Sequence, residues 1–133
     1  MSLKITLRPN EKVIINGAVI RSAGRSELHL ENSAALLRSK DVMQPEDANT
    51  PAKRLYYSCM MAYVDTANRE SLQREAADYL EQLLGALVAP QARLRCGNIA
   101  AHLARMDFYR AIGECKRLCV YEAEVLGRLG GSS

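Results

Sequence analysis

Val13-Ile14-Ile15-Asn16-Gly17-Ala18-Val19-Ile20 is the stretch that decides the fold of the first part of the chain. Two β-branched runs flank its central Asn16-Gly17 dipeptide. Asn-Gly favours a type I′ turn, because both central residues of that turn need a positive φ. The stretch therefore predicts a β-hairpin with strands at residues 13–15 and 18–20.

Apolar and polar residues continue to alternate on both sides of this hairpin. Ile5 and Leu7 alternate with Lys4, Thr6 and Arg8. A second turn at residues 22–24 leads into an alternating segment at 27–31, which Asn32-Ser33 breaks, and residues 35–38 fit a further strand. A period of two is typical of strands with one buried face. We therefore expect an antiparallel meander of four or five short strands.

The period changes to a helical one after about residue 45. Gln44-Pro45 through Thr50-Pro51 is rich in proline and polar residues, and Thr50-Pro51 is typical of a helix start, with a capping hydroxyl before a proline. Apolar residues then recur every three or four positions. They predict four helices: one from Pro51, one from the 65–68 cap to about Leu87, one from Pro90, and one from Asp107 to Gly130-Gly131.

These patterns define an α+β fold. We expect a small antiparallel β-meander packed with a C-terminal bundle of about four α-helices, since short loops make successive helices antiparallel neighbours. The expected organisation is a basic β-sheet module at residues 1–44, a linker at 45–50 and a helical bundle at 51–133.

The composition is that of an ordinary globular protein. The chain has 133 residues, 48% of them hydrophobic, and a formal charge of +3. It contains no tryptophan and one phenylalanine, which argues against a large aromatic substrate pocket. No stretch is long and apolar enough to span a membrane, and the N-terminus does not resemble a signal peptide. All four cysteines lie within helical patterns rather than in loops, so we expect reduced thiols and a cytoplasmic protein.

The cysteines and histidines do not form a convincing catalytic or metal site. Cys115 and Cys119 are one helical turn apart, with Cys96 and His102 on the preceding helix. Zinc sites favour a two-residue gap at a turn, whereas these thiols lie on or near apolar stripes. Six positions along one helix also point Cys96 and His102 in different directions. We therefore expect no metal, no cofactor and no enzymatic activity.

Basic residues are concentrated in the predicted sheet. Residues 1–40 hold seven Lys or Arg and only three Glu, whereas the remaining residues hold eleven basic and twelve acidic residues. The basic set is Lys4, Arg8, Lys12, Arg21, Arg25, Arg38 and Lys40. Such charges also protect sheet edges from pairing, but their excess favours nucleic-acid contact. Lys53 and Arg54, followed by two tyrosines, add a weaker candidate of the same kind.

Several separated segments resemble the FlbT family of flagellar biosynthesis regulators. They are residues 3–20, 40–46, 50–54, Tyr56, 62–63, 107–109 and 121–124, in order along the chain. The resemblance implies a bacterial post-transcriptional regulator that associates with the 5′ untranslated region of flagellin mRNA. In that family the usual outcome is repression and faster decay of the transcript, often opposed by the partner protein FlaF.

The strand-rich opening also resembles, more faintly, the CsrA family of small RNA-binding β proteins. Those proteins are interlocked dimers that read GGA in RNA loops and carry an RNA-facing arginine on the first strand. When Glu11 is aligned with their acidic turn residue, Leu7 takes the place of that arginine, so the resemblance does not extend to GGA recognition. It does imply a possible homo-oligomer through the β module.

Two functions therefore stay open from the sequence. In the first, the sheet presents basic side chains to single-stranded or looped RNA. In the second, the chain is a protein-interaction adaptor or chaperone, whose helical stripes hold FlaF or flagellin in a groove, and its effects on mRNA are indirect.

Overall fold

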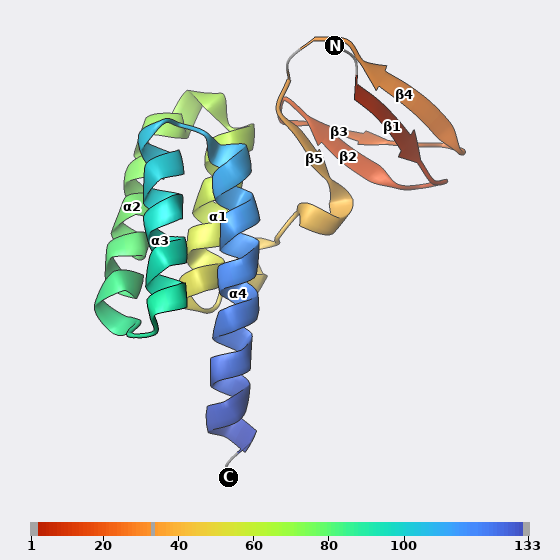
Figure 1. The fold of residues 1–133 in the computed structure, drawn as a ribbon. Coiled ribbons are helices and arrows are strands. Elements are labelled where there is room, and N and C mark those ends of the chain that lie inside the picture. Colours follow the sequence, from red (N-terminus) through yellow and green to blue (C-terminus); the bar gives the residue numbers. More distant parts are fainter. Residues whose placement is uncertain (1–2, 33, 132–133) are drawn as a thin grey trace. The chain divides into compact units, whose positions relative to one another are not determined.

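The computed structural model describes residues 3–32 and 34–131 of the chain, with side chains up to Gly127 (Figure 1). Ser33, which the sequence places in a strand break, lies outside these residues. The chain divides into two compact units, Met1–Val42 and Met43–Ser133. We refer to them as the strand unit and the helical unit.

The strand unit contains five short strands. They are β1 (Leu3–Leu7), β2 (Lys12–Ile15), β3 (Ala18–Arg21), β4 (Ser26–Leu30) and β5 (Leu36–Arg38), followed by the 3₁₀ turn η1 (Ser39–Asp41). All pairings are antiparallel. β1 pairs with β4 in a two-stranded sheet, and β3, β2 and β5 form a three-stranded sheet in that order.

The predicted hairpin is confirmed. Asn16 and Gly17 both have positive φ, at 50° and 85°, and β2 pairs with β3 on either side of them. The Asn16 side chain adds a second function, because its Oδ1 accepts a hydrogen bond from the Ala35 backbone N–H at 2.9 Å. The Asn16 N–H in turn donates to the Ala35 carbonyl at 2.8 Å. The turn therefore also anchors the approach to β5.

The connectivity differs from the predicted meander, because β1 does not pair with β2. Arg8 to Glu11 form a turn, in which the Glu11 N–H donates to the Arg8 carbonyl at 3.0 Å. Pro9 at the second position and a φ of 66° at Asn10 fit a type II turn. Since proline has no N–H for a ladder, β1 leaves the path of β2 at this point. It pairs instead with β4, from Leu3 opposite Leu30 to Leu7 opposite Ser26.

The core of the strand unit lies between its two sheets. Ile5, Leu7 and Val13 are at most 4% exposed. Ile15, Leu28, Leu30 and Leu36 pack against them. The predicted alternation holds from Lys4 to Leu7 on β1, where Lys4 and Thr6 are exposed and Ile5 and Leu7 are buried. β3 lies at one edge of the three-stranded sheet, and all four of its residues are exposed.

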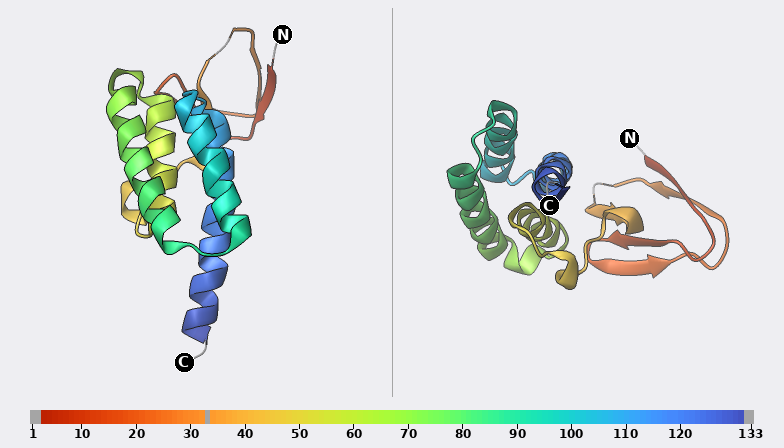
Figure 2. Two further views of the ribbon diagram at one scale, coloured as in Figure 1. Left: turned by 60° about the vertical axis from the view of Figure 1, so that its left-hand side comes forward. Right: turned by 90° about the horizontal axis from the view of Figure 1, so that it is seen from below.

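The helical unit contains four helices and two 3₁₀ turns. They are η2 (Pro45–Asp47), α1 (Pro51–Val64), η3 (Thr66–Asn68), α2 (Arg69–Ala86), α3 (Pro90–Ala104) and α4 (Phe108–Gly131). Contacts join α1 to α2, α2 to α3, α3 to α4 and α4 back to α1. The end-on view shows the resulting bundle (Figure 2). The α+β class, with antiparallel strands followed by four packed helices, is confirmed.

The start of α1 is fixed by a residue of α4. Thr50 is the N-cap, as predicted, and its hydroxyl accepts a hydrogen bond from the Lys53 N–H at 3.3 Å. The same hydroxyl donates to one carboxylate oxygen of Glu122, and the other oxygen accepts from the Ala52 N–H at 3.0 Å. Glu122 thus provides a hydrogen-bond acceptor for a backbone N–H at the N-terminus of α1, although 70 positions separate it from Ala52.

No helix within the described parts of the chain is both long and apolar enough to cross a membrane.

Candidate nucleic-acid interface

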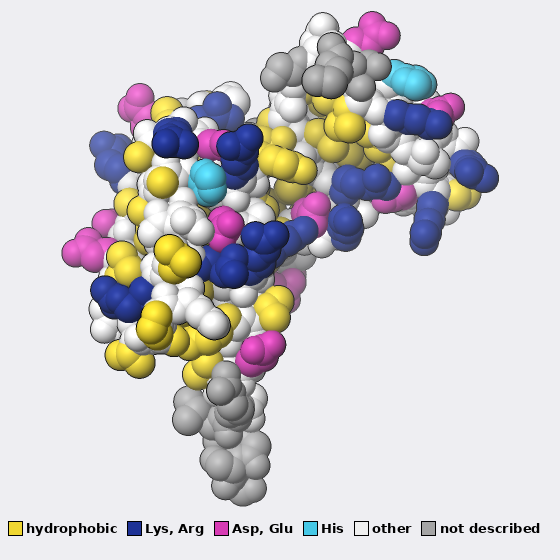
Figure 3. Space-filling view, viewed as in Figure 1, with side chains coloured by type: hydrophobic (Ala, Val, Ile, Leu, Met, Phe, Trp, Pro, Cys, Tyr) yellow, Lys and Arg dark blue, Asp and Glu magenta, His cyan; other side chains and the backbone are white. Residues whose placement is uncertain are grey.

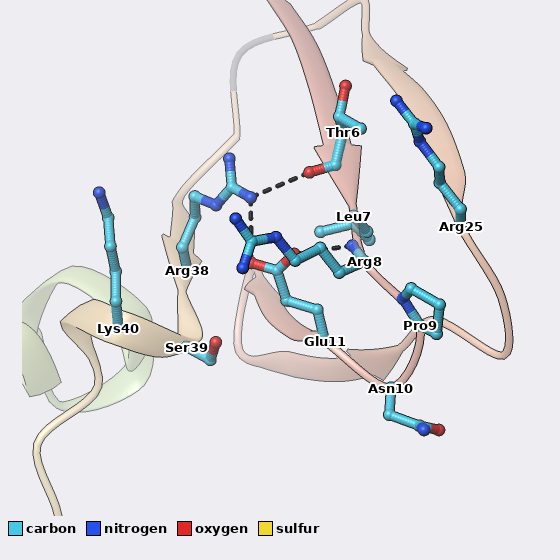
Figure 4. Close-up of a pocket in the computed structure, with 10 residues that line it drawn as sticks. All are labelled: Thr6, Leu7, Arg8, Pro9, Asn10, Glu11, Arg25, Arg38, Ser39 and Lys40. Carbon is cyan, nitrogen blue, oxygen red and sulfur yellow. Dashed lines mark hydrogen bonds and ion pairs between the residues drawn. The ribbon is translucent and has the colours of Figure 1, made fainter.

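A hollow of about 950 Å³ lies in the strand unit, at the end of β1 and the start of β2 (Figure 4). Its lining residues are Thr6, Leu7, Arg8, Pro9, Asn10, Glu11, Arg25, Arg38, Ser39 and Lys40. Four of them are cationic and only one is acidic. Its size lies near the top of the range of roughly 300–1,000 Å³ that is usual for ligand pockets. We call it the basic hollow.

The single carboxylate of the basic hollow, Glu11, is held on two sides. Its Oε1 accepts a hydrogen bond from the Arg8 backbone N–H at 2.9 Å. Its Oε2 lies 3.0 Å from Nη2 of Arg38, and the same Nη2 donates to the Thr6 carbonyl of β1, also at 3.0 Å. Arg38 therefore ties β5 to β1 and to the turn before β2 (Figure 4).

The other three cations of the basic hollow are available to a ligand. Arg8, Arg25 and Lys40 are exposed. Within residues 3–32 and 34–131, their side chains make no hydrogen bond or ion pair. Charged groups without a protein partner are the kind that neutralise phosphates. The structure therefore brings together Arg8, Arg25, Arg38 and Lys40 from three separated parts of the sequence.

The remaining predicted residues of the strand unit lie outside the basic hollow. Lys4 is on β1 and pairs with Glu27 of β4 at 2.6 Å, with both side chains largely exposed. Arg21 donates from Nη1 to Oδ1 of Asn10 at 2.9 Å. Lys12 lies opposite Arg21 in the β2–β3 ladder. Lys and Arg side chains are spread over this unit in the space-filling view (Figure 3).

Lys53 and Arg54 belong to the helical unit, in the first turn of α1. Arg54 is exposed and Lys53 is half-buried. The side chains of neither form a hydrogen bond or ion pair within the described chain. They are therefore a separate cationic position, and the basic hollow is complete without them.

The turn from Arg8 to Glu11 was missed as part of the site by sequence reasoning, which had used Glu11 only for alignment. The signal was present, because Arg8-Pro9-Asn10-Glu11 has proline and asparagine at the two central positions of a type II turn. Such a turn places the Glu11 side chain within reach of the Arg8 N–H. The contact between Glu11 and Arg38 has no comparable sequence signal, since 27 positions separate them.

The contacts of Glu11 make its charge dependent on pH in a defined direction. The Arg8 N–H, and then Arg38, hold the pKa of Glu11 below the ordinary value of 4.5. A depressed carboxyl pKa stabilises the fold above the unfolded-state value, and this contribution is lost as the pH falls through the folded-state pKa.

We expect the NMR shift of the Arg8 amide proton to follow this titration, with a midpoint below pH 4.5. In Glu11→Gln the transition should disappear from the Arg8 amide. A midpoint at or above 4.5 in the wild type would contradict the contacts described here.

Three of the four cysteines are buried free thiols, and Cys119 is partly buried. Cys59, Cys96 and Cys115 are buried, and Sγ of Cys115 lies 3.9 Å from Sγ of Cys59. Burial, and then the charge of Glu122, raise the pKa of Cys119 to about 11, and burial also raises the pKa of Cys96. Thiols of this kind are poor nucleophiles. The described residues include no cluster of three or more His, Cys, Asp or Glu suited to a metal ion.

Known proteins resemble this chain over nearly its full length. The family described as "Flagellar protein FlbT" matches residues 3–126. A "Probable flagellum biosynthesis repressor protein FlbT" of Caulobacter sp. (strain K31) is 38% identical over 97% of this chain and 99% of its own length. The "Flagellum biosynthesis repressor protein FlbT" of Caulobacter vibrioides (strain ATCC 19089 / CIP 103742 / CB 15) is 37% identical, over 97% of this chain and 92% of its own length.

A more distant relative also matches over nearly the full length of this chain. The "Probable flagellum biosynthesis repressor protein FlbT" of Rhodopseudomonas palustris (strain TIE-1) is 30% identical over 96% of this chain and all of its own length. No solved structure matches the chain significantly. The matched range covers both the strand unit with its basic hollow and most of the helical unit. By this full-length similarity the chain belongs to the FlbT family of flagellar proteins.

Proposed function

We propose that this chain is a flagellum biosynthesis repressor that acts after transcription, by binding the 5′ untranslated region of flagellin mRNA through the basic hollow. The repressor role is taken from the names of its Caulobacter relatives. The observation that carries the binding mechanism is the grouping of four cations around a single carboxylate, with three of the cations unpaired.

An open basic hollow of this size suits unpaired RNA. Cationic side chains bind the phosphates, while the bases of a loop or single strand stay free to contact the protein surface around them. The chain need not cleave the message itself. Bound near a ribosome-binding site, it would block translation, and a transcript without ribosomes would then be open to cellular nucleases.

RNA binding is tested by its dependence on salt. If the four cations neutralise four phosphates, log affinity for the flagellin leader should fall with log salt at a slope of about −3 for a single strand. The double variant Arg8→Ala plus Arg25→Ala should make the slope shallower, at about −1.5, since two phosphate contacts are lost. Filter binding between 50 and 300 mM salt, roughly the range over which such slopes are resolved, measures both values.

A matched double variant controls for net charge. Arg74→Ala plus Arg105→Ala removes the same charge from exposed arginines of the helical unit. It should keep a slope near that of the wild type, and an RNA of shuffled sequence tests whether binding is specific. A wild-type protein that retains no leader RNA at low salt would rule out the proposed function.

A second candidate function is an adaptor that binds a FlaF-type protein or flagellin through the helical unit. It is favoured by a hollow of about 400 Å³ between α2 and α3 with a mainly apolar lining. The lining includes Ala77, Leu80, Leu84, Ala100 and Leu103. Co-purification of such a protein without RNA at low salt would favour this function. The two functions are compatible, because they use different units.

A further inference from the structure

Glu11 presents an electrostatic contradiction within the basic hollow. A carboxylate among four cations repels phosphate, so its removal would ordinarily strengthen the binding of RNA. The contacts of Glu11, however, indicate that the residue supports binding. Glu11 is the residue that holds the side chain of Arg38 in place, together with the Thr6 carbonyl.

We propose that Glu11 is a positioning residue for RNA binding: it fixes the Arg38 guanidinium so that this cation meets one phosphate of the RNA without having to be ordered first. The inference rests on the proposed function, because it concerns the same basic hollow. Arg38 thereby differs from Arg8, Arg25 and Lys40, although all four residues carry the same charge.

The contacts of Arg38 support this division. Both protein contacts use Nη2, which leaves the N–H donors of Nη1 and Nε unused within the described chain. The Arg38 side chain is 35% exposed and that of Glu11 is 20% exposed, so the pair is partly shielded while Arg38 still lines the basic hollow. In Figure 4, Arg38 projects toward β1 and Glu11, across the space between β5 and the turn.

Fixing a long cation before binding is an energetic advantage. A free arginine loses rotamer freedom when it binds a phosphate, and this loss reduces affinity. Arg8, Arg25 and Lys40 incur this cost, since no hydrogen bond or ion pair within residues 3–32 and 34–131 holds their side chains. Arg38 has already incurred it on folding. Guanidinium groups retain enough donors to bind a carboxylate and a phosphate together.

The backbone of the turn fixes Glu11 itself. The Arg8 N–H donates to Oε1, on the opposite carboxylate oxygen from Arg38. The type II turn at Pro9 and Asn10 brings the Arg8 N–H and the Glu11 side chain together. Both contacts of Arg38 are thus tied to backbone, one to the turn through Glu11 and the other to β1 through the Thr6 carbonyl.

The test compares two carboxylates of the same unit. Glu11→Ala is expected to weaken binding of the flagellin leader by about fivefold, the cost of ordering one long side chain. The salt slope should stay near that of the wild type, because Arg38 still neutralises its phosphate. Glu27→Ala removes the same charge, but among the described residues Glu27 pairs with Lys4 alone, on the exposed face of β1 and β4. This control should tighten binding about twofold, because a negative charge near the RNA is lost.

Two more variants separate positioning from folding. Glu11→Gln keeps an oxygen that accepts a hydrogen bond, so it should bind RNA more tightly than Glu11→Ala. In an Arg38→Ala background, Glu11→Ala should no longer weaken binding and should tighten it, because only its charge is then felt. Two-dimensional amide spectra of each variant verify that the strand unit is folded.

The outcomes are distinguishable. If the wild type binds the leader and Glu11→Ala tightens binding as Glu27→Ala does, the positioning role is overturned and the proposed function stands. The same holds if Glu11→Ala weakens binding equally with and without Arg38. If the wild type binds no RNA, the proposed function is overturned, and the positioning role with it.

Discussion

Leu55→Ala is expected to lower the free energy of unfolding of the helical unit by about 3 kcal/mol, within a usual range of about 2–5 kcal/mol for such a substitution. Leu55 lies on α1 and is fully buried. α1 contacts both α2 and α4, so a void at this position faces the centre of the bundle. The loss combines the transfer of apolar atoms with the contacts that surrounding side chains no longer make.

Urea unfolding followed by far-UV circular dichroism measures this change, since the helices dominate that signal. Leu94→Ala is the matched control, because Leu94 is on α3 and 69% exposed. It should change stability by less than about 0.5 kcal/mol. Similar losses for the two leucines would show that the buried stripe of α1 is not the centre of the core.

Glu122→Ala is expected to destabilise the helical unit by about 2–3 kcal/mol, as hydrogen bonds to a charged group contribute more than neutral ones. The Ala52 N–H loses its partner, and the Thr50 hydroxyl loses its acceptor. The carboxylate also lies at the positive end of α1, where negative charge is favourable. The substitution should release the first turn of α1 from α4.

Hydrogen exchange of the Ala52 amide locates this effect, and urea unfolding gives its size. Glu122→Gln keeps the hydrogen-bond acceptor without the charge, so its loss should be smaller. Glu81→Ala removes an exposed carboxylate from α2 and should be close to neutral. Unchanged protection at Ala52 in Glu122→Ala would exclude Glu122 as the acceptor of the Ala52 N–H.

Local features of the fold were predictable from the sequence because local chemistry determines them. Asn16-Gly17 specifies its turn through the φ that both residues adopt. Thr50-Pro51 specifies a helix start through a hydroxyl acceptor and a fixed φ. The alternation on β1 correctly separated buried Ile5 from exposed Lys4.

Strand pairing was predicted less well, since it depends on contacts between distant residues. Adjacent strands in sequence often pair, and this tendency led to the meander. The preference of Pro9 for a turn without a ladder hydrogen bond, and the left-handed Asn10, redirect β1 to β4. Pro9 and Asn10 could be read from the sequence as a turn. Which strand β1 then pairs with depends on contacts between distant parts of the chain, which the sequence pattern does not give.

The candidate site shows the same limit. Charge counting identified every cation of the basic hollow but treated the basic residues of the sheet as one surface. The structure separates them, because Lys4 and Arg21 lie outside the lining of the basic hollow and each contacts a neighbouring side chain, whereas Arg8 and Arg25 line it and make no side-chain hydrogen bond or ion pair in the described chain. No periodicity encodes which cation finds a carboxylate 27 positions away.

The exposed edge strand β3 bears on how this protein behaves at high concentration. Val19 and Ile20 are 65% and 41% exposed there, and Arg21 is the only charge that the strand carries. Bare edges of this kind recruit the same edge of other molecules, and a lone cation at the end acts as a gatekeeper against aggregation. Neutralising Arg21 would thus promote aggregation. A loss of RNA retention in that variant could then be mistaken for the loss of a contact between Arg21 and RNA.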